Sequence, residues 1–223
     1  MDTQKRIIIW FSAILVVIIA AIGAYQVATG VPQELPRKDG TMSPPLDATD
    51  RTKGTKTPKI TFVEYSDFQC PACGAYYPML EEMFSEYKDR ISFTYRHFPL
   101  PQHKNALPSA YASEAAGKQD KFWEMVDLLF KNQSDWAENA NAQLIFEGYA
   151  QKLELDIAQF KKDMQSDEVK TKVERDRKSG QLSAIIQTPT FFINGKMATN
   201  PKSKEELKAL IEYAIAHPVR EPN

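Results

Sequence analysis

An unbroken apolar run is the first feature in the pattern of hydrophobic and polar residues along the chain. Residues 7–25 include no charged side chain, whereas Lys5 and Arg6 precede them and the next charge is Glu34. A run of 19 residues is long enough to cross a bilayer as a helix. The positive-inside rule then leaves the N-terminus in the cytoplasm and exports the rest of the chain. We therefore predict a single-pass protein of the cell membrane, with residues 1–25 as the N-terminus and transmembrane anchor.

A cleaved signal peptide is the alternative for the same run. Ala21, Ile22 and Gly23 include the small residues that a signal peptidase site requires. The apolar run is, however, longer than the apolar region of about 7 to 15 residues that is usual in signal peptides. We therefore favour the uncleaved anchor.

A polar segment rich in proline follows the apolar run. Residues 26–58 contain 5 prolines and show no apolar periodicity. Such a segment cannot bury enough apolar surface to offset the entropy lost on ordering. We predict a flexible linker that holds the following domain away from the membrane.

From residue 59 the pattern changes to alternating strands and helices. Ile60 to Tyr65 is apolar at most positions, as in a strand that is buried on both faces. A helix is predicted to begin at Pro71, which suits a first helical turn, and to be kinked by Pro78. Residues 91–96 alternate between apolar and polar, which is the period of a strand. Together these elements predict a strand–helix–strand unit with a right-handed crossover.

A helical block separates this unit from a second group of strands. No strand pattern occurs between residues 105 and 184, and apolar residues from Phe122 to Leu129 recur at helical spacing. Residues 190–193 then predict a strand, Asn194 and Gly195 a two-residue hairpin turn, and 196–198 the return strand. A final amphipathic helix follows. The predicted order is β-α-β, a helical insert, then β-β-α.

These patterns define the predicted domain boundaries. The first part of the α/β domain, the helical insertion, the second part of the α/β domain and a short tail are predicted at 59–104, 105–186, 187–217 and 218–223.

The overall charge argues against binding to nucleic acid. The chain has 28 Lys and Arg and 29 Asp and Glu residues, a net charge of −1. The runs 170–178 and 202–208 mix both signs, as solvated helix faces do. We predict no nucleic-acid partner.

The only two cysteines of the chain, Cys70 and Cys73, lie at the predicted strand-to-helix junction. A structural zinc ion normally needs four ligands, and the three histidines are distant in sequence, so no metal is predicted. A purely structural disulfide would gain little, because so short a loop restricts the unfolded chain weakly. A Cys-x-x-Cys at this place is instead typical of a dithiol–disulfide redox centre, which requires no cofactor.

The geometry of a helix start gives the two cysteines different chemistry. Free N–H groups and the helix dipole at Cys70 favour a thiolate. Cys73 lies one turn later on the same face, where it can attack a mixed disulfide formed on Cys70. The intervening Pro71 and Ala72 offer no side-chain donor to the Cys70 sulfur, so the backbone and the dipole must stabilise the thiolate.

Three further features accompany the cysteines. Glu64 lies within the apolar strand; if buried, it would have a raised pKa and could exchange a proton with Cys73 through water. The alternative is a Glu at the strand end that faces solvent. Thr188 and Pro189 precede the strand at 190–193, where a proline marks an edge or a turn. His97 and His103 flank a predicted loop, and we expect lone loop histidines to be solvated.

Three parts of the chain together resemble the DsbA-like thiol–disulfide oxidoreductases of the thioredoxin superfamily. They are the Phe-Gln-Cys-Pro-Ala-Cys motif at 68–73, the Thr-Pro-Thr-Phe-Phe-Ile-Asn-Gly motif at 188–195, and the helical block between them. The resemblance extends over about residues 59–217. It implies the α/β thioredoxin fold with an inserted all-helical domain.

The resemblance also implies a role for each motif residue. Cys70 corresponds to the exposed nucleophile and Cys73 to the buried resolving thiol. Pro189 corresponds to the cis-proline that faces the active site in this family, and Thr188 to the residue whose backbone pairs with the substrate. Glu64 matches the buried acid that precedes the motif.

The chain departs from the family at two places. Many DsbA-type oxidants carry His before the second cysteine, where this chain has Ala72, and this removes one group that stabilises the thiolate. Relatives often place Gly near Thr188, where this chain has the larger residues 185–187. These differences bear on the redox potential and on the substrate groove.

The activity implied by the resemblance is the introduction of disulfides into exported proteins that bear cysteines. A membrane partner of the quinone reductase type would reoxidise the dithiol. The same residues could also work in reverse, as an exported reductase or as an isomerase. A different class of function is a tethered polypeptide-binding module in which the cysteines play no catalytic part.

Overall fold

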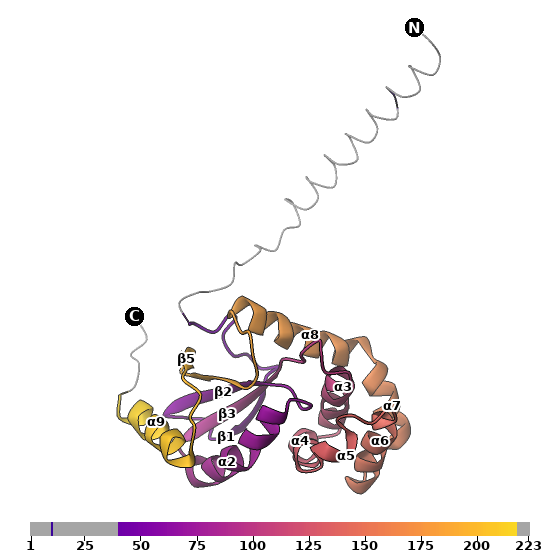
Figure 1. Ribbon diagram of the computed structural model, residues 1–223, viewed down its shortest axis with the longest axis horizontal. Helices are drawn as coiled ribbons and strands as arrows, with labels where there is room; N and C mark the ends of the chain where they lie inside the picture. The colour runs from indigo at the N-terminus through magenta and orange to yellow at the C-terminus, as the bar shows by residue number, and fades with distance from the viewer. Residues whose placement is uncertain (1–9, 11–39, 218–223) are drawn as a thin grey trace. The chain divides into compact units, whose positions relative to one another are not determined.

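A five-stranded sheet forms the centre of the computed structural model, which describes Trp10 and residues 40–217. The strand order is β1-β3-β2-β4-β5 (Figure 1). β2 pairs in parallel with β3, and the other neighbours pair in antiparallel orientation. β2 is apolar at most positions and buried on both faces, as its sequence predicts. β3 is buried at every position although its sequence alternates, so Ser92, Thr94 and Arg96 are polar residues inside the domain. The strands are β1 (Arg51–Gly54), β2 (Ile60–Ser66), β3 (Ile91–His97), β4 (Thr190–Ile193) and β5 (Lys196–Ala198).

Helices cover both faces of this sheet (Figure 1). α2 (Pro71–Tyr87) and α9 (Lys204–Ala216) pack on the face that carries Phe62 and Phe191. Val63, Tyr65 and Phe192 point to the opposite face, which α8 (Asp167–Leu182) lines through Ser179. The sheet therefore lies between two layers, and α2 begins directly after the loop that follows β2.

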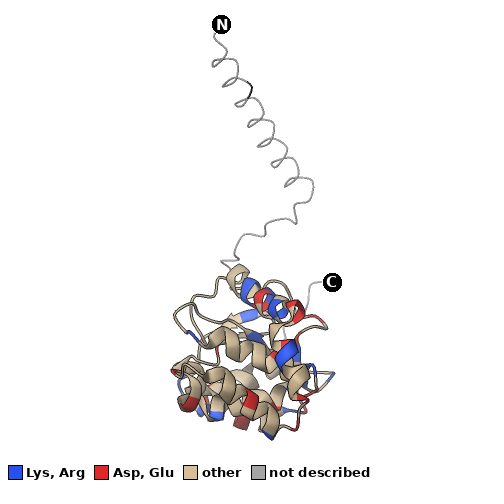
Figure 2. Ribbon diagram, turned by 90° about the vertical axis from the view of Figure 1, so that its right-hand side faces the viewer, with Lys and Arg blue, Asp and Glu red and all other residues tan. Residues whose placement is uncertain are grey.

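The helical insertion is confirmed between β3 and β4. Its helices are α3 (Ala106–Gly117), α4 (Phe122–Lys131), α5 (Gln133–Trp136), α6 (Ala142–Lys152), α7 (Ile157–Gln165) and α8. Their apolar faces enclose a second core around Leu129, Trp136 and Phe160. Figure 2 shows basic and acidic residues along the same helices. Some of them form ion pairs within one helix, as Lys131 does with Asp127.

The hairpin at the end of the sheet forms as its sequence predicts. Asn194 and Gly195 have φ angles of 49° and 73°, the left-handed region that a two-residue turn of this kind requires. The Asn194 side chain also accepts a hydrogen bond from the Thr61 backbone N–H at 2.9 Å. The turn thus fixes the register of β4 and β5 and ties it to β2.

The predicted linker 26–58 is wrong over the part that the structure describes. Residues 51–54 form β1 and pair with β3, and the preceding segment packs against the domain. Arg96 of β3 donates to the Pro44 and Pro45 carbonyl oxygens and forms a buried ion pair with Asp50 at 2.8 Å. β1 consists of Arg, Thr, Lys and Gly, so no apolar periodicity marks it as a strand. It is an edge strand that its pairing with the distant β3 stabilises.

Other predictions fall on residues that the structure does not describe. They are the transmembrane anchor, the alternative cleavage site, the start of the linker and the tail at 218–223. Within residue 10 and residues 40–217, no helix combines the length and apolar character needed to span a membrane.

Candidate active site

Both cysteines lie where β2 passes into α2, and both are free thiols. Cys70 precedes the first turn of α2, and its N–H donates to the Asp67 carbonyl oxygen at 3.0 Å. Pro71 takes the first helical position, where a missing N–H costs nothing. Cys73 is one turn further and completely buried. The cysteine pair therefore combines a helix N-terminus with the edge of the core.

Cys70 is less accessible than the resemblance to DsbA-like proteins implies. Its exposed fraction is 6%, against 0% for Cys73. The loop before β4 covers it, and the Cys70 Sγ atom lies 3.5 Å from the Thr188 carbonyl oxygen. Cys70 remains the more accessible thiol of the two, but only a small part of its surface is open to a reacting partner.

The surroundings lower the pKa of the Cys70 thiol to about 5. The hydrogen bond from the Cys73 thiol is the largest cause, and backbone N–H groups of the first helical turn add to it. Burial of Cys70 opposes the effect because it disfavours the charged sulfur. The Cys70 sulfur is therefore a thiolate at neutral pH.

The pKa of Cys73 moves in the opposite direction. Burial raises it well above the usual value, and the hydrogen bond to Cys70 and the charge of Glu64 raise it further. Cys73 consequently holds its proton when Cys70 has lost its own. One sulfur is prepared for nucleophilic attack and the other for donating a hydrogen bond.

The Thr188–Pro189 peptide bond is cis, and this loop faces Cys70. Thr188 is buried, and the Pro189 carbonyl oxygen accepts a hydrogen bond from Asn200 at 2.7 Å. The structure thus brings two segments together that are 118 residues apart in sequence.

Glu64 is buried on the face of the sheet that α2 covers. Its exposed fraction is 2%, so the alternative of a solvent-facing side chain is wrong. Burial raises the pKa of Glu64 to about 7, although a hydrogen bond from Ser66 and the charge of Lys53 both lower it. The carboxyl can therefore hold or release a proton near neutral pH beneath the two cysteines.

Asp67 and His103 brace the loop before the cysteines, and the sequence did not reveal this pair. The buried Asp67 carboxylate accepts hydrogen bonds from the backbone N–H of Gln69 at 2.8 Å and of Leu100 at 3.0 Å. His103 Nδ1 lies 2.6 Å from the same carboxylate. The expectation that both loop histidines are solvated is wrong, because His103 is half-buried against Asp67 and His97 is buried in β3. The Asp-x-Gln spacing of an Asx turn is the sequence signal that could have indicated this loop.

The helical insertion also reaches the cysteine loop. Gln133 of α5 donates to the carbonyl oxygens of Phe68 at 2.6 Å and Cys70 at 2.9 Å. A Cβ atom on Gly74 would lie only 2.7 Å from Gln133 Oε1, so glycine directly after Cys73 permits this approach. The sequence could not indicate this role of Gln133, because Gln133 is more than 60 residues from its partners and belongs to no motif.

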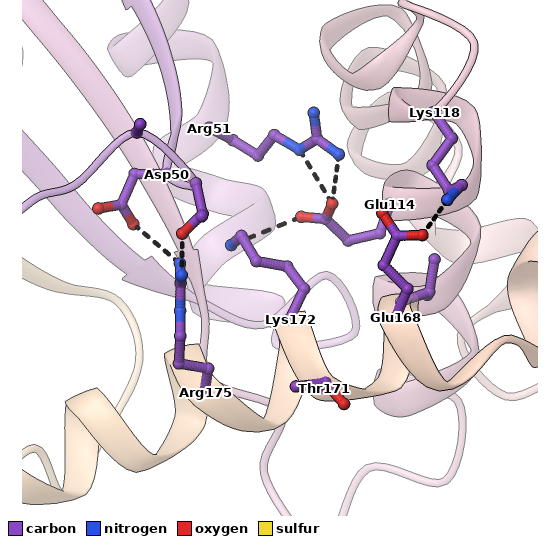
Figure 3. A pocket seen from close by; sticks show the side chains of 11 residues that line it. Asp50, Arg51, Glu114, Lys118, Glu168, Thr171, Lys172 and Arg175 are labelled. Carbon is purple, nitrogen blue, oxygen red and sulfur yellow. Dashed lines mark hydrogen bonds and ion pairs between the residues drawn. The ribbon is translucent and has the colours of Figure 1, made fainter.

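Two of the hollows in the described part of the chain differ in their lining. One, of about 370 Å³, is lined by charged residues of α3, α8 and the segment before β1, and Figure 3 shows them close to one another. Arg51 pairs with Glu114, Lys118 with Glu168, and Arg175 lies 3.5 Å from Asp47. The basic side chains that line this hollow are thus paired with acidic ones, so the hollow presents no unbalanced charge to a ligand.

The second hollow is a groove of about 590 Å³ beside the Thr188 loop. Ile185, Ile186 and Met197 contribute apolar surface to it, and Ile186 is 90% exposed. Cys70 does not line this groove, but the loop between Gln187 and Thr190 connects the two, because its Thr188 carbonyl oxygen lies 3.5 Å from the Cys70 Sγ atom. Among the described residues, no group of three His, Cys, Asp or Glu side chains is arranged to hold a metal ion.

Comparison with known families agrees with this geometry. The sequence matches the Thioredoxin family over residues 47–213, which includes both cysteines, Glu64 and the Thr188 loop. The chain belongs to the thioredoxin family.

Solved structures show the same fold. BdbD from Bacillus subtilis superimposes with a TM-score of 0.68 at 24% identity, over 80% of this chain and 99% of that one. Alpha-DsbA1 from Wolbachia pipientis gives a TM-score of 0.69 at 19% identity, over 77% of this chain and 93% of the other. DsbA2 from Pseudomonas aeruginosa gives 0.61 at 22% identity, over 79% and 100%. The thioredoxin fold with a helical insertion is confirmed.

Curated relatives are much longer than the region they share with this chain. A protein named Na(+)/H(+) antiporter NhaA 1 from Salinispora arenicola is 36% identical over 168 residues, which are 75% of this chain and 25% of that protein. A second, NhaA 3 from Salinispora tropica, matches to the same extent. The chain spans about a quarter of these relatives, so their name describes proteins of which the shared domain is one part.

Proposed function

We propose that this chain is a thiol–disulfide oxidoreductase that forms disulfides in exported proteins through Cys70 and Cys73. The observation that carries the proposal is the opposed state of the two thiols at the start of α2. The pKa of Cys70 is lowered to about 5, while Cys73 is buried with a raised pKa and donates to Cys70. A purely structural cysteine pair has no need of this asymmetry.

The reaction begins with the disulfide between Cys70 and Cys73. A substrate thiolate attacks the Cys70 sulfur, a substrate–Cys70 disulfide forms, and Cys73 leaves with the electron pair and takes a proton. A second substrate thiolate then attacks the substrate sulfur of this mixed disulfide, and Cys70 leaves as a thiolate. The substrate loses two electrons and the protein gains them, so both active-site sulfurs end reduced.

In this proposal Glu64 supplies the proton that Cys73 needs. It is buried beside the cysteines, and burial raises the pKa of its carboxyl to about 7. A carboxylic acid close to neutrality can give a proton to a leaving thiolate and recover one from solvent.

The direction of transfer follows from which form of the protein the fold stabilises. A thiolate that is stabilised in the dithiol state makes the disulfide form a better oxidant, by roughly 30 mV for each unit by which its pKa falls. The lowered pKa of Cys70 therefore supports a disulfide donor over a reductase or an isomerase.

Substrates are cysteine-bearing exported polypeptides in this proposal. The groove with Ile186 and Met197 offers apolar surface beside the loop that contacts Cys70, and the backbone of Thr188 would pair with the bound chain. The apolar run at 7–25 supports an anchor in the cell membrane with the cysteines outside, where a quinone reductase partner would reoxidise them. Segments similar to this domain also occur in proteins named as antiporters, which is consistent with a function at a membrane.

The experiment compares the full chain in detergent or nanodiscs with its Cys70→Ser and Cys73→Ser variants. Oxidised wild type should form a disulfide in a reduced two-cysteine peptide, and Cys70→Ser should abolish this. Cys73→Ser should instead trap a mixed disulfide when it is offered an activated substrate disulfide. If Cys70→Ser retained its effect on the peptide or on client folding, the protein would be a polypeptide-binding module rather than an oxidoreductase.

A further inference from the structure

Glu64 has a polar neighbour, Ser66, on its own strand. Glu64 and Ser66 are two residues apart on β2, so both side chains project to the face that α2 covers. The Ser66 hydroxyl donates to Glu64 Oε1 at 2.7 Å, and the exposed fraction of Ser66 is 1%. This is a buried bond between a hydroxyl and the carboxyl that lies beneath the cysteines.

Other ionisable and polar groups face Glu64 from β1, β3 and the start of α2. Lys53 reaches toward it from β1, but the Lys53 ammonium is paired with Glu81 of α2 at 2.6 Å. Cys70, directly before α2, and Glu81 on α2 both repel the negative charge of Glu64. Tyr95, the neighbour of Glu64 across the β2–β3 pairing, brings a second buried hydroxyl, which forms no hydrogen bond to Glu64. Within the described part of the chain, Ser66 supplies the hydrogen bond that the Glu64 carboxyl receives.

We propose that Ser66 is a positioning residue: its hydroxyl fixes the Glu64 carboxyl and sets the pH at which Glu64 exchanges a proton with Cys73. The proposal rests on the thiol–disulfide exchange proposed above. When substrate breaks the Cys70–Cys73 bond, Cys73 takes a proton and the Glu64 acid becomes a carboxylate. The Ser66 O–H then donates to a charged oxygen, and a hydrogen bond to an ion is stronger than one to a neutral group.

Loss of the hydroxyl should therefore disfavour the ionised carboxyl. In Ser66→Ala the Glu64 carboxylate loses its donor while burial is unchanged, so its titration should move to higher pH, by about one unit. Ser66→Thr keeps a hydroxyl on a residue that suits a strand, and it should restore the wild-type titration. A merely structural serine would change stability without moving this pH midpoint.

The test uses the full chain with one matched control. Ser113 of α3 is also completely buried and donates its hydroxyl to a backbone carbonyl, at 2.9 Å, in the helical insertion. Single-turnover reduction of the oxidised protein by a dithiol peptide is followed from pH 5 to 9 in wild type, Ser66→Ala, Ser66→Thr, Ser113→Ala and Glu64→Gln. The carboxyl titration of Glu64 is read in parallel by ¹³C NMR, and near-ultraviolet circular dichroism reports folding.

We expect Ser66→Ala, alone among the variants, to move two midpoints to higher pH: that of the Glu64-dependent step in the pH–rate profile and that of the Glu64 NMR titration. In Glu64→Gln this step of the pH–rate profile should be absent. Coincident midpoints for wild type and Ser66→Ala, in a wild type that exchanges disulfides, would overturn the role of Ser66 only. A wild type that does not exchange disulfides would refute the proposed function, and this inference with it.

Discussion

At the scale of single residues, the site depends on placing ionisable groups in opposed surroundings. Cys70 receives hydrogen bonds that favour its charge, whereas burial disfavours charge on Cys73 and Glu64. No one of these residues would be reactive in the same way on an exposed surface. The strand β2 and the start of α2 provide the contrast within ten residues of sequence, from Glu64 to Cys73.

Burial of Glu64 should make the stability of the protein depend on pH. The pKa of Glu64 is raised from 4.5 to about 7, so the native state keeps a proton that the unfolded chain releases. Stability should therefore be highest below pH 4.5 and fall as the pH rises to about 7, with a total loss of about 3 kcal/mol. Glu64→Gln should remove this dependence.

The measurement is urea unfolding of the oxidised protein between pH 4 and pH 8, because oxidation removes the titration of the thiols. Asp89→Asn, which changes an exposed carboxylate, serves as the control and should leave the slope with pH unchanged. An identical slope in wild type and Glu64→Gln would contradict a raised pKa at this position.

At the scale of elements, the local pattern predicted most of the fold. β2, α2, β3 and the hairpin at Asn194 follow from apolar periodicity and turn chemistry, and the insertion follows from the lack of strand pattern. β1 could not be predicted in this way, since its residues are Arg, Thr, Lys and Gly. Its pairing depends on β3 and on Arg96, which are more than 35 residues away in sequence.

The residues of the site also fall into those with a local sequence signal and those that depend on distant contacts. Cys70, Cys73, Glu64, Thr188 and Pro189 could be predicted because they belong to local motifs or to a resemblance that carries them. His103 and Gln133 act through contacts with distant loops, and nothing adjacent to them in the sequence indicates a partner.

The Arg96–Asp50 pair should be essential for holding β1 and the segment before it. Both side chains are almost fully buried, and Asp50 accepts from the Arg96 Nε and Nη2 atoms at 2.8 Å each. Asp50→Asn would leave a buried guanidinium without its counter-charge, at a cost of about 3 to 5 kcal/mol in the free energy of unfolding. Glu212→Gln, in the exposed pair with Arg90, should cost far less.

Chemical denaturation of the two variants beside wild type gives the comparison. Equal losses for the buried and exposed pairs would mean that the segment before β1 does not depend on Arg96.

At the scale of the whole molecule, the thioredoxin domain and the helical insertion meet at the cysteines. Gln133 joins α5 to the loop of Phe68 and Cys70, and the second core of the insertion reaches both cysteines. The redox state of the cysteines should therefore affect the stability of the whole domain.

The dithiol form should be more stable than the disulfide form at pH 7. The folded dithiol gains stability at this pH because the pKa of Cys70 is lowered from 9.0 to about 5. The disulfide restricts the unfolded chain by only about 2 kcal/mol, because its loop is so short. Since the pKa is depressed in the folded state, the gain is complete above pH 9 and is lost as the pH falls through about 5.

Urea midpoints of both redox forms at pH 5, 7 and 9 would show this as a difference that grows with pH. Midpoints that favour the oxidised form at pH 9 would exclude a stabilised Cys70 thiolate.

The equilibrium reduction potential of the Cys70–Cys73 pair against glutathione tests the central claim most directly. A disulfide donor should equilibrate closer to the roughly −120 mV of DsbA than to the roughly −270 mV of thioredoxin, with the Cys70 thiolate titrating near pH 5 in the same samples. A potential near that of thioredoxin would contradict a disulfide donor and identify a reductase on the same fold.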